Sequence, residues 1–265
     1  MGRLRVVVSG ATGRMGRALA QLAAAREVEL VGGVARAPVE PEVAAALGYP
    51  QIEGPEGAAP LLAAADVWID FSAPPLLQQL LAAVPIDWNR AVVVGTTGLD
   101  EATLAALDAL AVRCPVLRAS NFSVGVHLLA EIAAMAARVL TEADTEIVET
   151  HHRHKVDAPS GTALFLAEQV AAARGWAWPQ ARRDGRSGAV GPRPREEIGL
   201  HAVRGGEVIG EHRVLFLAPA ERLELAHGVQ DRAVFADGAL RAGRWLVGRP
   251  PGRYTMRQVL GFEAT

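Results

Sequence analysis

Short apolar runs alternate with amphipathic stretches at the start of the chain. Residues 3–9 form a Val-rich run, residues 17–25 an Ala- and Leu-rich helical stretch, and residues 28–34 a second apolar run. Continuous apolar runs of this length are typical of strands that are buried on both faces of a parallel sheet. The pattern therefore predicts a strand, a helix and a second, parallel strand.

The same alternation continues to residue 122. Further buried strands are predicted at residues 67–71, 91–95 and 116–119, with helices between them at 76–84 and 101–112. Strands that alternate with helices of about ten residues are typical of α/β folds. The first part of the chain is therefore predicted to form a Rossmann-type, doubly wound parallel sheet.

The pattern changes after residue 122. Longer helices and strand-like runs follow, and residues 176–197, rich in Pro, Gly and Arg, show no periodicity and predict a mobile loop. Helices are predicted at 126–140, 163–174 and 235–247, and strands at 145–150, 198–204, 207–216 and 222–230. We expect an α+β domain with an open sheet over residues 123–231. The tail, residues 232–265, is expected to pack back on residues 1–122.

Composition and charge exclude several classes of protein. The net charge is −2 and the pI about 6.4, so no basic field favours a nucleic-acid partner. The single cysteine, Cys114, excludes an internal disulfide and a cysteine-built metal site. The apolar run at the start is too short for a signal peptide, and no apolar stretch is long enough to span a membrane. We expect a cytoplasmic protein with no nucleic-acid or membrane partner.

A glycine-rich turn follows the first predicted strand. Gly10, Gly13 and Gly16 are spaced three apart and precede a helix. Glycines at such a turn let the backbone approach a pyrophosphate, and the helix N-terminus supplies amide donors with a partial positive charge. Arg14 and Arg17 add cations. This context favours a dinucleotide site, although an ordinary strand–helix turn remains the alternative.

The end of the second predicted strand bears on the choice between NADH and NADPH. An acidic residue about 20 positions after the glycines binds the ribose hydroxyls of NAD. Residues 32–36 contain no acid and end in Arg36, which favours the 2′-phosphate of NADPH. An exposed arginine without a ligand is the alternative. Polar turns at 70–72, 95–98 and 121–123 also lie at the ends of predicted strands, where ligands bind in such sheets. Each could be a ligand contact or an ordinary polar turn.

Lys155 is the only lysine among the 27 lysine and arginine residues. Arginine replaces lysine as a charge but does not release a proton at accessible pH, whereas lysine can. Lys155 closes the run 151–155, which holds three of the seven histidines. His151 and Lys155 are four residues apart, so they share a face in either a strand or a helix. The run indicates proton transfer, and a lysine kept by chance in a solvated loop is the alternative.

The segment after this run predicts a helix start. Ser160 or Thr162 could be a plain N-cap. Because no Glu or Gln lies three residues after Ser160, we expect free first-turn amides that suit a substrate carboxylate. A zinc site built on the three histidines is the competing interpretation, but their spacing matches no zinc motif, so no metal is predicted.

Four segments together resemble one family. Residues 10–16, 95–98, 121–126 and 149–163 look like 4-hydroxy-tetrahydrodipicolinate reductase, also called dihydrodipicolinate reductase. The resemblance implies a dinucleotide-binding domain, residues 1–122 and 232–265, and a substrate-binding and oligomerisation domain, residues 123–231, in a homotetramer. It also implies the NAD(P)H-dependent reduction of 4-hydroxy-tetrahydrodipicolinate, a small dicarboxylate, to tetrahydrodipicolinate with loss of water, in lysine and diaminopimelate synthesis.

The resemblance assigns roles to single residues. His151 matches a proton donor and acceptor, and Lys155 a proton donor, while His152, Gly161 and Thr162 match substrate contacts. The residues that match the cofactor site are Gly10, Ala11, Thr12, Gly13, Arg14, Met15, Arg36, Gly95, Thr96, Thr97, Ala119, Ser120, Asn121 and Phe122. The chain departs from family members that use both cofactors, which carry an acidic residue where Ala35 stands.

Two other functions stay open on the residues alone. A different Rossmann-type amino-acid or imine dehydrogenase would share the glycine turn but should lack the block around Lys155. A non-catalytic regulator would bind NADPH and turn nothing over.

Overall fold

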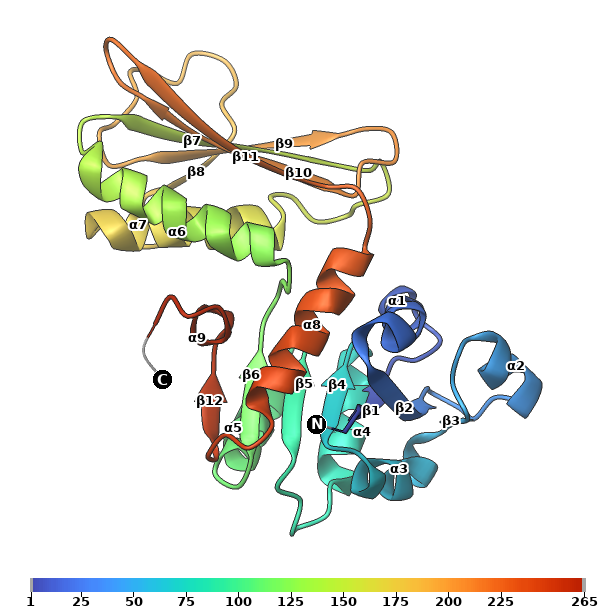
Figure 1. Ribbon diagram of the computed structural model, residues 1–265. Helices are drawn as coiled ribbons and strands as arrows, with labels where there is room; N and C mark the ends of the chain where they lie inside the picture. The colour runs from blue at the N-terminus through green and yellow to red at the C-terminus, as the bar shows by residue number, and fades with distance from the viewer. Residues whose placement is uncertain (1, 264–265) are drawn as a thin grey trace. The chain divides into compact units, whose positions relative to one another are not determined.

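The computed structural model describes residues 2–263 and divides the chain into two compact units. Unit 1 contains the chain up to Ser123 together with the segment that begins at Arg232, and unit 2 is Val124–Asp231. Figure 1 shows that each unit has its own sheet and its own helices. No helix of the described residues is both long enough and apolar enough to cross a membrane.

Unit 1 is built on a parallel sheet that runs β12-β6-β5-β4-β1-β2-β3 through the described residues. Its strands are β1 (Leu4–Ser9), β2 (Val28–Val34), β3 (Ile52–Glu53), β4 (Val67–Asp70), β5 (Ala91–Val94), β6 (Pro115–Arg118) and β12 (Gly252–Tyr254). Every residue of β4 and β5 is buried, as the continuous apolar runs predict. Apart from β12, the order is that of a Rossmann sheet, so the predicted fold class is confirmed.

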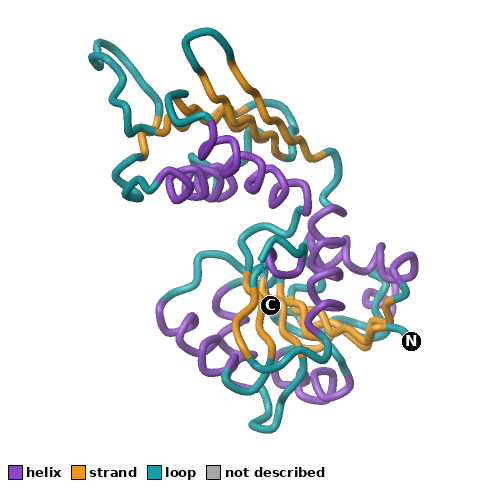
Figure 2. Tube along the Cα trace, turned by 60° about the vertical axis from the view of Figure 1, so that its left-hand side comes forward, coloured by secondary structure: helices purple, strands orange, loops and turns teal. Residues whose placement is uncertain are grey.

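Helices cover both faces of this sheet, as Figure 2 shows. Helices α1 and α8 pack on one face around Leu19 and Leu240, and α3, α4 and α5 pack on the other around Leu77. The helical segments of unit 1 are α1 (Arg14–Ala23), η1 (Ala24–Arg26), α2 (Pro41–Ala46), η2 (Pro55–Gly57), α3 (Ala58–Ala64), α4 (Pro74–Ala83), α5 (Glu101–Ala111), α8 (Ala233–Leu246) and α9 (Met256–Val259).

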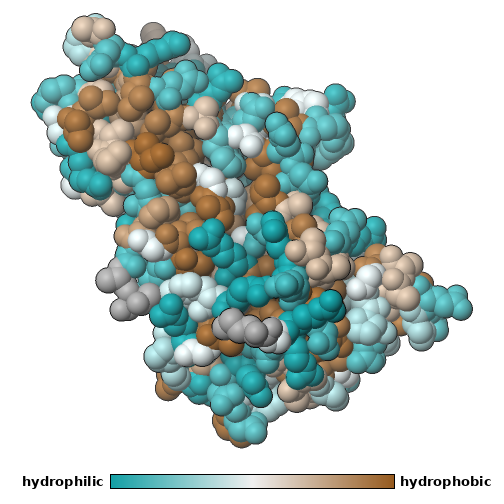
Figure 3. All heavy atoms as spheres, in the orientation of Figure 1, coloured by the Kyte–Doolittle hydropathy of each residue, from teal (hydrophilic) through white to brown (hydrophobic). Residues whose placement is uncertain are grey.

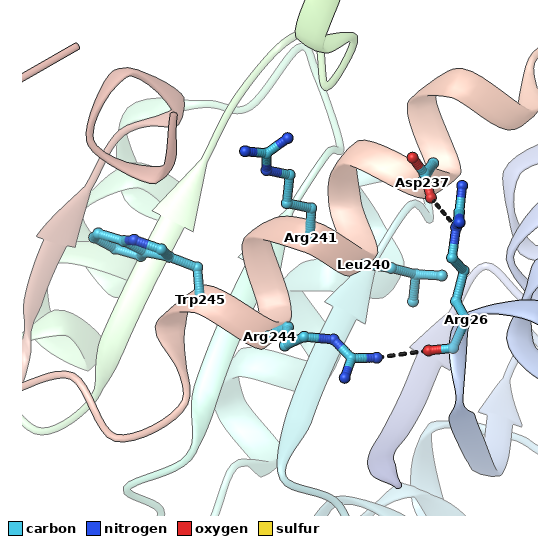
Figure 4. A pocket seen from close by; sticks show the side chains of 6 residues that line it. All are labelled: Arg26, Asp237, Leu240, Arg241, Arg244 and Trp245. Carbon is cyan, nitrogen blue, oxygen red and sulfur yellow. Dashed lines mark hydrogen bonds and ion pairs between the residues drawn. The ribbon is translucent and has the colours of Figure 1, made fainter. Parts of the chain in front are cut away.

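The C-terminal segment returns to the N-terminal part of unit 1. Strand β12 pairs with β6 at the sheet edge, and α8 packs against α1. Figure 4 shows how α8 is joined to η1: Asp237 pairs with Arg26, and Arg244 donates to the Arg26 carbonyl. These residues line a surface hollow of about 470 Å³ with Leu240, Arg241 and Trp245. Two contacts between segments more than 200 residues apart hold the ends of unit 1 together.

Unit 2 has a mixed sheet with helices α6 (Val124–Val139) and α7 (Gly161–Arg174) on one face (Figure 2). The strand order is β11-β10-β7-β9-β8, and the strands are β7 (Asp144–His151), β8 (Arg182–Asp184), β9 (Ile198–Arg204), β10 (Gly210–Leu217) and β11 (Arg222–Val229). Strands β7, β9 and β8 are parallel, whereas β10 is antiparallel to β7 and β11. Ile147, Leu166 and Phe216 are fully buried between the sheet and the helices.

The segment 176–197, predicted as a mobile loop, contains a strand. Residues Arg182–Asp184 form β8, which pairs with β9. Arg186 binds both carboxylate oxygens of Glu146 at 2.8 and 2.9 Å, and Arg193 donates to one of them at 3.1 Å. Backbone pairing and ion pairs organise this segment. Neither needs apolar residues at a regular spacing, so the sequence pattern does not reveal them.

Helix α6 carries apolar side chains on its outer surface. Leu128, Met135 and Val139 are exposed, and Figure 3 shows brown, hydrophobic atoms gathered over this helix. Ala133 and Ala137 on the opposite side are fully buried against the unit 2 core. In α6 apolar side chains lie on both the buried and the exposed sides, since Val126 and Leu129 are buried as well, so hydrophobicity alone does not identify its buried face.

Candidate active site

The glycine turn between β1 and α1 is shaped by close backbone approaches. Gly10 has φ +81°, and a Cβ there would lie 2.3 Å from the carbonyl oxygen of Phe71. A Cβ on Gly16 would lie 2.4 Å from the carbonyl oxygen of Ala11. No larger residue fits either position without a shift of the backbone. Helix α1 begins at Arg14, three residues earlier than predicted, so Arg14 and Met15 lie in its first turn.

A cavity of about 420 Å³ lies beside this turn, at the carboxyl ends of β4 and β5. It is lined by Arg14, Met15, Phe71, Ser72, Ala73, Pro74, Gly95, Thr96 and Thr97. The structure therefore brings together five of the predicted cofactor residues, from the glycine turn and from the turn after β5. Parallel sheets bind ligands at this edge, and Arg14 gives the cavity a cation suited to phosphate.

The other predicted cofactor residues lie near the same edge of the sheet. Ala11 donates to the carbonyl of Val34 at 3.2 Å, and Gly13 donates to that of Gly10 at 2.9 Å, so residues 10–13 are part of the turn itself. Arg36 is exposed just beyond β2. Residues 119–122 follow β6, where Phe122 is buried edge-on against Phe71 with ring centroids 5.4 Å apart.

Asp70 is a fully buried carboxylate below the cavity. It accepts hydrogen bonds from the hydroxyls of Ser9, Ser72 and Thr96, which follow or end three different strands. Burial raises the pKa of Asp70, and these hydrogen bonds oppose that effect only in part. In the predicted polar turn 70–72, Asp70 holds the strand ends together, whereas Ser72 lines the cavity.

In unit 2, His151 ends β7, and Glu149 holds its ring. Nδ1 of His151 lies 2.6 Å from Oε2 of Glu149, whose side chain has no exposed surface. Arg204 donates to both Glu149 oxygens at 2.7 Å, and the amide of Ser160 donates to Oε1 at 3.0 Å. Burial alone would raise the pKa of Glu149, but these hydrogen bonds outweigh it and lower the pKa. Glu149 is therefore a buried anion.

The pKa of His151 lies below its ordinary value. Burial lowers it, the bond to Glu149 opposes this, and the charges of Lys155 and Arg204 lower it further. The His151 ring is therefore mainly neutral at pH 7. Since the charge of Lys155 acts on His151, the structure brings the two predicted proton-transfer residues into one electrostatic environment.

Lys155 lies on a turn and not on a strand or helix that continues from His151. Its backbone amide donates to the carbonyl of His152 at 3.1 Å, and its side chain is 20% exposed. The ammonium lies 2.8 and 3.0 Å from the two carboxylate oxygens of Asp157. The periodicity argument for a shared face was therefore wrong, because the chain reverses direction after His151.

His212 lies behind His151 on the neighbouring strand β10. The two rings meet edge-on with centroids 5.2 Å apart, and Nε2 of His212 is 3.1 Å from Oγ of Ser160. Burial lowers the pKa of His212 to about 3, and repulsion from His151, when that ring is protonated, adds to the effect. His212 is therefore neutral throughout the physiological range.

The start of α7 differs from the prediction in one respect. Ser160 is the N-cap, and its hydroxyl accepts from the amide of Ala163 at 3.1 Å, so this first-turn amide is not free. Gly161 is exposed and Thr162 half-buried at the first two positions of the helix. His152 is half-buried, and its backbone amide donates to the carbonyl of Val208 at 2.7 Å.

The histidines of the run do not form a metal site. His154 is exposed and lies 3.8 Å from Glu207, whereas His151 is buried against Glu149. Across residues 2–263, no three His, Cys, Asp or Glu side chains are arranged to hold a metal ion.

Sequence reasoning missed Glu149, Arg204 and His212. Glu149 could have been found, because residues two apart on a strand face the same side and His151 was already a candidate. Arg204 and His212 come from β9 and β10, and only strand pairing brings them to β7. Their positions in the sequence carry no signal of that pairing.

Comparisons with known proteins agree with this geometry. Residues 4–122 match the family model described as dihydrodipicolinate reductase, N-terminus, and residues 125–260 match the model for its C-terminus. The 4-hydroxy-tetrahydrodipicolinate reductase of Alkalilimnicola ehrlichii is 46% identical over 266 residues, which cover 97% of this chain and 99% of that protein. The protein of the same name from Thiobacillus denitrificans is 44% identical, covering 98% and 99%.

A solved structure shows the same fold. The dipicolinate-bound dihydrodipicolinate reductase from Paenisporosarcina sp. TG-14 aligns with a TM-score of 0.69 and 24% identity, covering 96% of this chain and 98% of that one. The family models span both units, and the relatives match along nearly their whole length. The chain therefore belongs to the 4-hydroxy-tetrahydrodipicolinate reductase family, a family of oxidoreductases of lysine and diaminopimelate synthesis.

Proposed function

We propose that this protein reduces 4-hydroxy-tetrahydrodipicolinate to tetrahydrodipicolinate, with NADPH preferred over NADH, and that His151 and Lys155 carry the proton transfer. The observation that carries the proposal is the pairing of a neutral, carboxylate-bound His151 with the charge of the only lysine in the chain. In the overall reaction, one hydride and one proton are taken up and the 4-hydroxyl group leaves as water.

Unit 1 fits a pyridine nucleotide. The cavity at the carboxyl edge of the parallel sheet combines a glycine turn, a helix start and the Arg14 cation. We assign nucleotide binding to this unit, through Gly10 to Met15, Gly95 to Thr97 and Ala119 to Phe122. When bound, the reduced nicotinamide supplies the hydride. The residues of the turn hold the pyrophosphate through backbone amides and through the Arg14 guanidinium.

Unit 2 supplies the proton. Loss of the 4-hydroxyl group as water leaves an imine conjugated to C4. As C4 then gains hydride, negative charge develops towards the imine nitrogen. Lys155 is a cation that can donate a proton there, and His151 accepts or donates through the nitrogen that Glu149 does not bind. General acid catalysis of this kind contributes about 10²- to 10⁴-fold to the rate.

The start of α7 binds a substrate carboxylate in this proposal. Gly161 and the Thr162 hydroxyl lie at the first helical positions, where the helix has a partial positive charge. His152 adds a polar contact next to His151. A charge-assisted hydrogen bond from Thr162 is worth about 1.5–3 kcal/mol. These contacts orient the ring for reduction.

Arg36 supports the preference for NADPH. Its side chain is exposed at the end of β2, and residues 32–36 contain no acid that would bind the ribose diol or repel a 2′-phosphate. One charge-assisted contact of about 1.5–3 kcal/mol corresponds to a preference of about 10- to 150-fold.

We also propose a cytoplasmic homotetramer that assembles through unit 2. Its helices cover one face of the sheet, while Val203 and Leu217 are exposed on the other. In this proposal that face of the sheet, with its exposed apolar side chains, forms the subunit interface. Light scattering after size-exclusion chromatography measures the assembly, and a monomer would contradict the proposal.

The activity is tested directly by mixing the purified protein with NADPH and freshly made 4-hydroxy-tetrahydrodipicolinate. We expect absorbance at 340 nm to fall with time, and faster with NADPH than with NADH. If NADPH is oxidised in the presence of another imine or amino-acid substrate but not in the presence of 4-hydroxy-tetrahydrodipicolinate, the protein is a different dehydrogenase. Binding of NADPH with no turnover of any substrate would favour a regulator.

A further inference from the structure

Two pairs of side chains in unit 2 are joined by a single guanidinium. Arg204 donates to both oxygens of Glu149, which holds His151, and also to the backbone carbonyl of Asp157 at 2.8 Å. Asp157 in turn binds the ammonium of Lys155. Both proposed proton-transfer residues are therefore attached to Arg204 through one intermediate residue each.

The hydrogen bonds around Glu149 decide which nitrogen of His151 carries the proton. Glu149 is ionised and has only acceptor atoms, so Nδ1 of His151 must donate to it. In the neutral ring this leaves Nε2 without a proton. A side chain at Gly210 would lie 3.0 Å from Nε2, so the glycine there keeps space beside this nitrogen.

We propose that Glu149 and Arg204 are positioning residues that fix His151 with its proton on Nδ1, so that Nε2 is the atom that exchanges a proton with the substrate. The inference rests on the proposed function for the identity of the reaction. Neither residue touches the reacting atoms in this proposal. Glu149 acts through His151, and Arg204 acts through Glu149 and through the backbone that carries Asp157.

Glu146 provides a matched control on the same strand. It is also a largely buried carboxylate, it lies 2.6 Å from Nε2 of His201, and it binds both nitrogens of the Arg186 fork. Residues 146 and 149 are three apart on a strand, so the two carboxylates face opposite sides of the sheet. Glu146 therefore reproduces the histidine–carboxylate–arginine arrangement without His151 or Lys155.

The central variant is Glu149→Gln, compared with Glu146→Gln. The Ser160 amide and one nitrogen of Arg204 both donate to Oε1, so the oxygen of the new amide side chain takes that position. Its NH₂ group takes the position of Oε2, where it faces Nδ1 of His151 and loses the bond from the other Arg204 nitrogen. We expect the neutral His151 ring to switch its proton to Nε2, which ¹⁵N NMR of the imidazole nitrogens detects without any turnover. The expected loss in kcat is about 10- to 100-fold, part of the contribution of general acid–base catalysis.

The pH profile provides a second readout. In a plot of kcat against pH, the limb that disappears in His151→Ala reports the titration of His151. We expect this limb to move to lower pH in Glu149→Gln, because the carboxylate that raised the pKa of His151 has been lost. The other charged or titratable groups near this ring, Lys155, Arg204 and His212, are unchanged in the variant. Glu146→Gln should keep the profile, the NADPH affinity and kcat, while losing thermal stability.

Arg204→Lys is a second test of the proposal, for use if the Glu149→Gln variant does not fold. It keeps a cation but loses the fork that binds both carboxylate oxygens, so we expect a loss in kcat of up to about 10-fold. The His151 limb should not move to lower pH in this variant, because Glu149, the group that raises the pKa of His151, is retained. An unchanged tautomer and limb in folded Glu149→Gln would overturn the proposal, as would an equal loss of kcat in Glu146→Gln. Were the wild type to reduce no substrate, the proposed reaction would fail, while the NMR comparison would still decide the role of Glu149.

Discussion

The ammonium of Lys155 lies within 3.0 Å of both carboxylate oxygens of Asp157. The pair joins residues two apart on an irregular segment, and the lysine side chain is only 20% exposed. Asp157 thus holds the one lysine of the chain in a defined place. The bond from Lys155 is the largest effect on Asp157 and lowers the pKa of that carboxyl, although burial opposes its ionisation.

The first prediction concerns this ammonium. Lys155→Ala and His151→Ala should each lower kcat by at least about 10²-fold and leave NADPH affinity near that of the wild type, because both act in proton transfer. Lys155→Arg should fail almost as badly, since it keeps the charge but cannot release a proton. Stopped-flow or steady-state kinetics check this. Substantial activity in Lys155→Arg would show that Lys155 acts only through its charge.

The second prediction separates the cap of α7 from the substrate contact. Thr162→Val should raise the KM of the substrate by about tenfold and barely change the Tm, because one charge-assisted hydrogen bond is lost. Ser160→Ala should instead lower the stability by about 1 kcal/mol or more, since Ser160 caps the helix and also contacts His212. Thermal melts beside kinetics distinguish the two. A large fall in Tm for Thr162→Val with an unchanged KM would make Thr162 structural.

The third prediction concerns the choice of cofactor. Arg36→Ala should reduce the ratio of kcat/KM for NADPH to that for NADH by about 10-fold or more, because the 2′-phosphate loses a charge-assisted contact. In the wild type the ratio should fall as salt is added, since Arg36 is exposed. A wild type that prefers NADH, or an Arg36→Ala variant with an unchanged ratio, would contradict the assignment. The reverse change, Ala35→Glu, is less suitable, because Ala35 is buried and a carboxylate there would be desolvated.

The fourth prediction concerns stability in acid. Burial lowers the pKa of His212 from 6.5 to about 3, so the folded state holds the neutral ring. Below pH 6.5 the unfolded chain binds a proton that the folded chain does not, so this contribution to stability is present above pH 6.5 and is lost progressively towards pH 3. In His212→Asn the difference in Tm between pH 7.5 and pH 5 should shrink by at least about 2 °C.

The exposed His154 provides the control for this measurement. His154→Asn should leave the difference in Tm between the two pH values unchanged. An equal change in both variants would mean that His212 does not account for the loss of stability between these pH values.

Residues near each other in the sequence determined much of this protein. Strands β2 and β9 were predicted to the residue, and β1 and β5 to within one residue at each end. The strands of unit 1 were predictable because buried parallel strands need continuous apolar runs, which a short stretch of sequence shows. The glycine turn was local in part, since Gly16 meets backbone atoms of its own turn, whereas Gly10 meets Phe71, which follows β4. The short elements β3, α2, β8 and β12 were missed, because two to six residues carry too little periodicity.

Only the tertiary structure decided how His151 is held. Glu149, Arg204 and His212 belong to three strands, and the pairing of β7 with β9 and β10 places them around one ring. Such pairing depends on the packing of a whole sheet and not on the residues beside His151. The sequence thus singled out His151 and Lys155 as candidates for proton transfer through their chemistry, whereas the shared face predicted from their spacing was wrong. The fold supplied the buried carboxylate and arginine, because charges can be held out of water only where several segments meet.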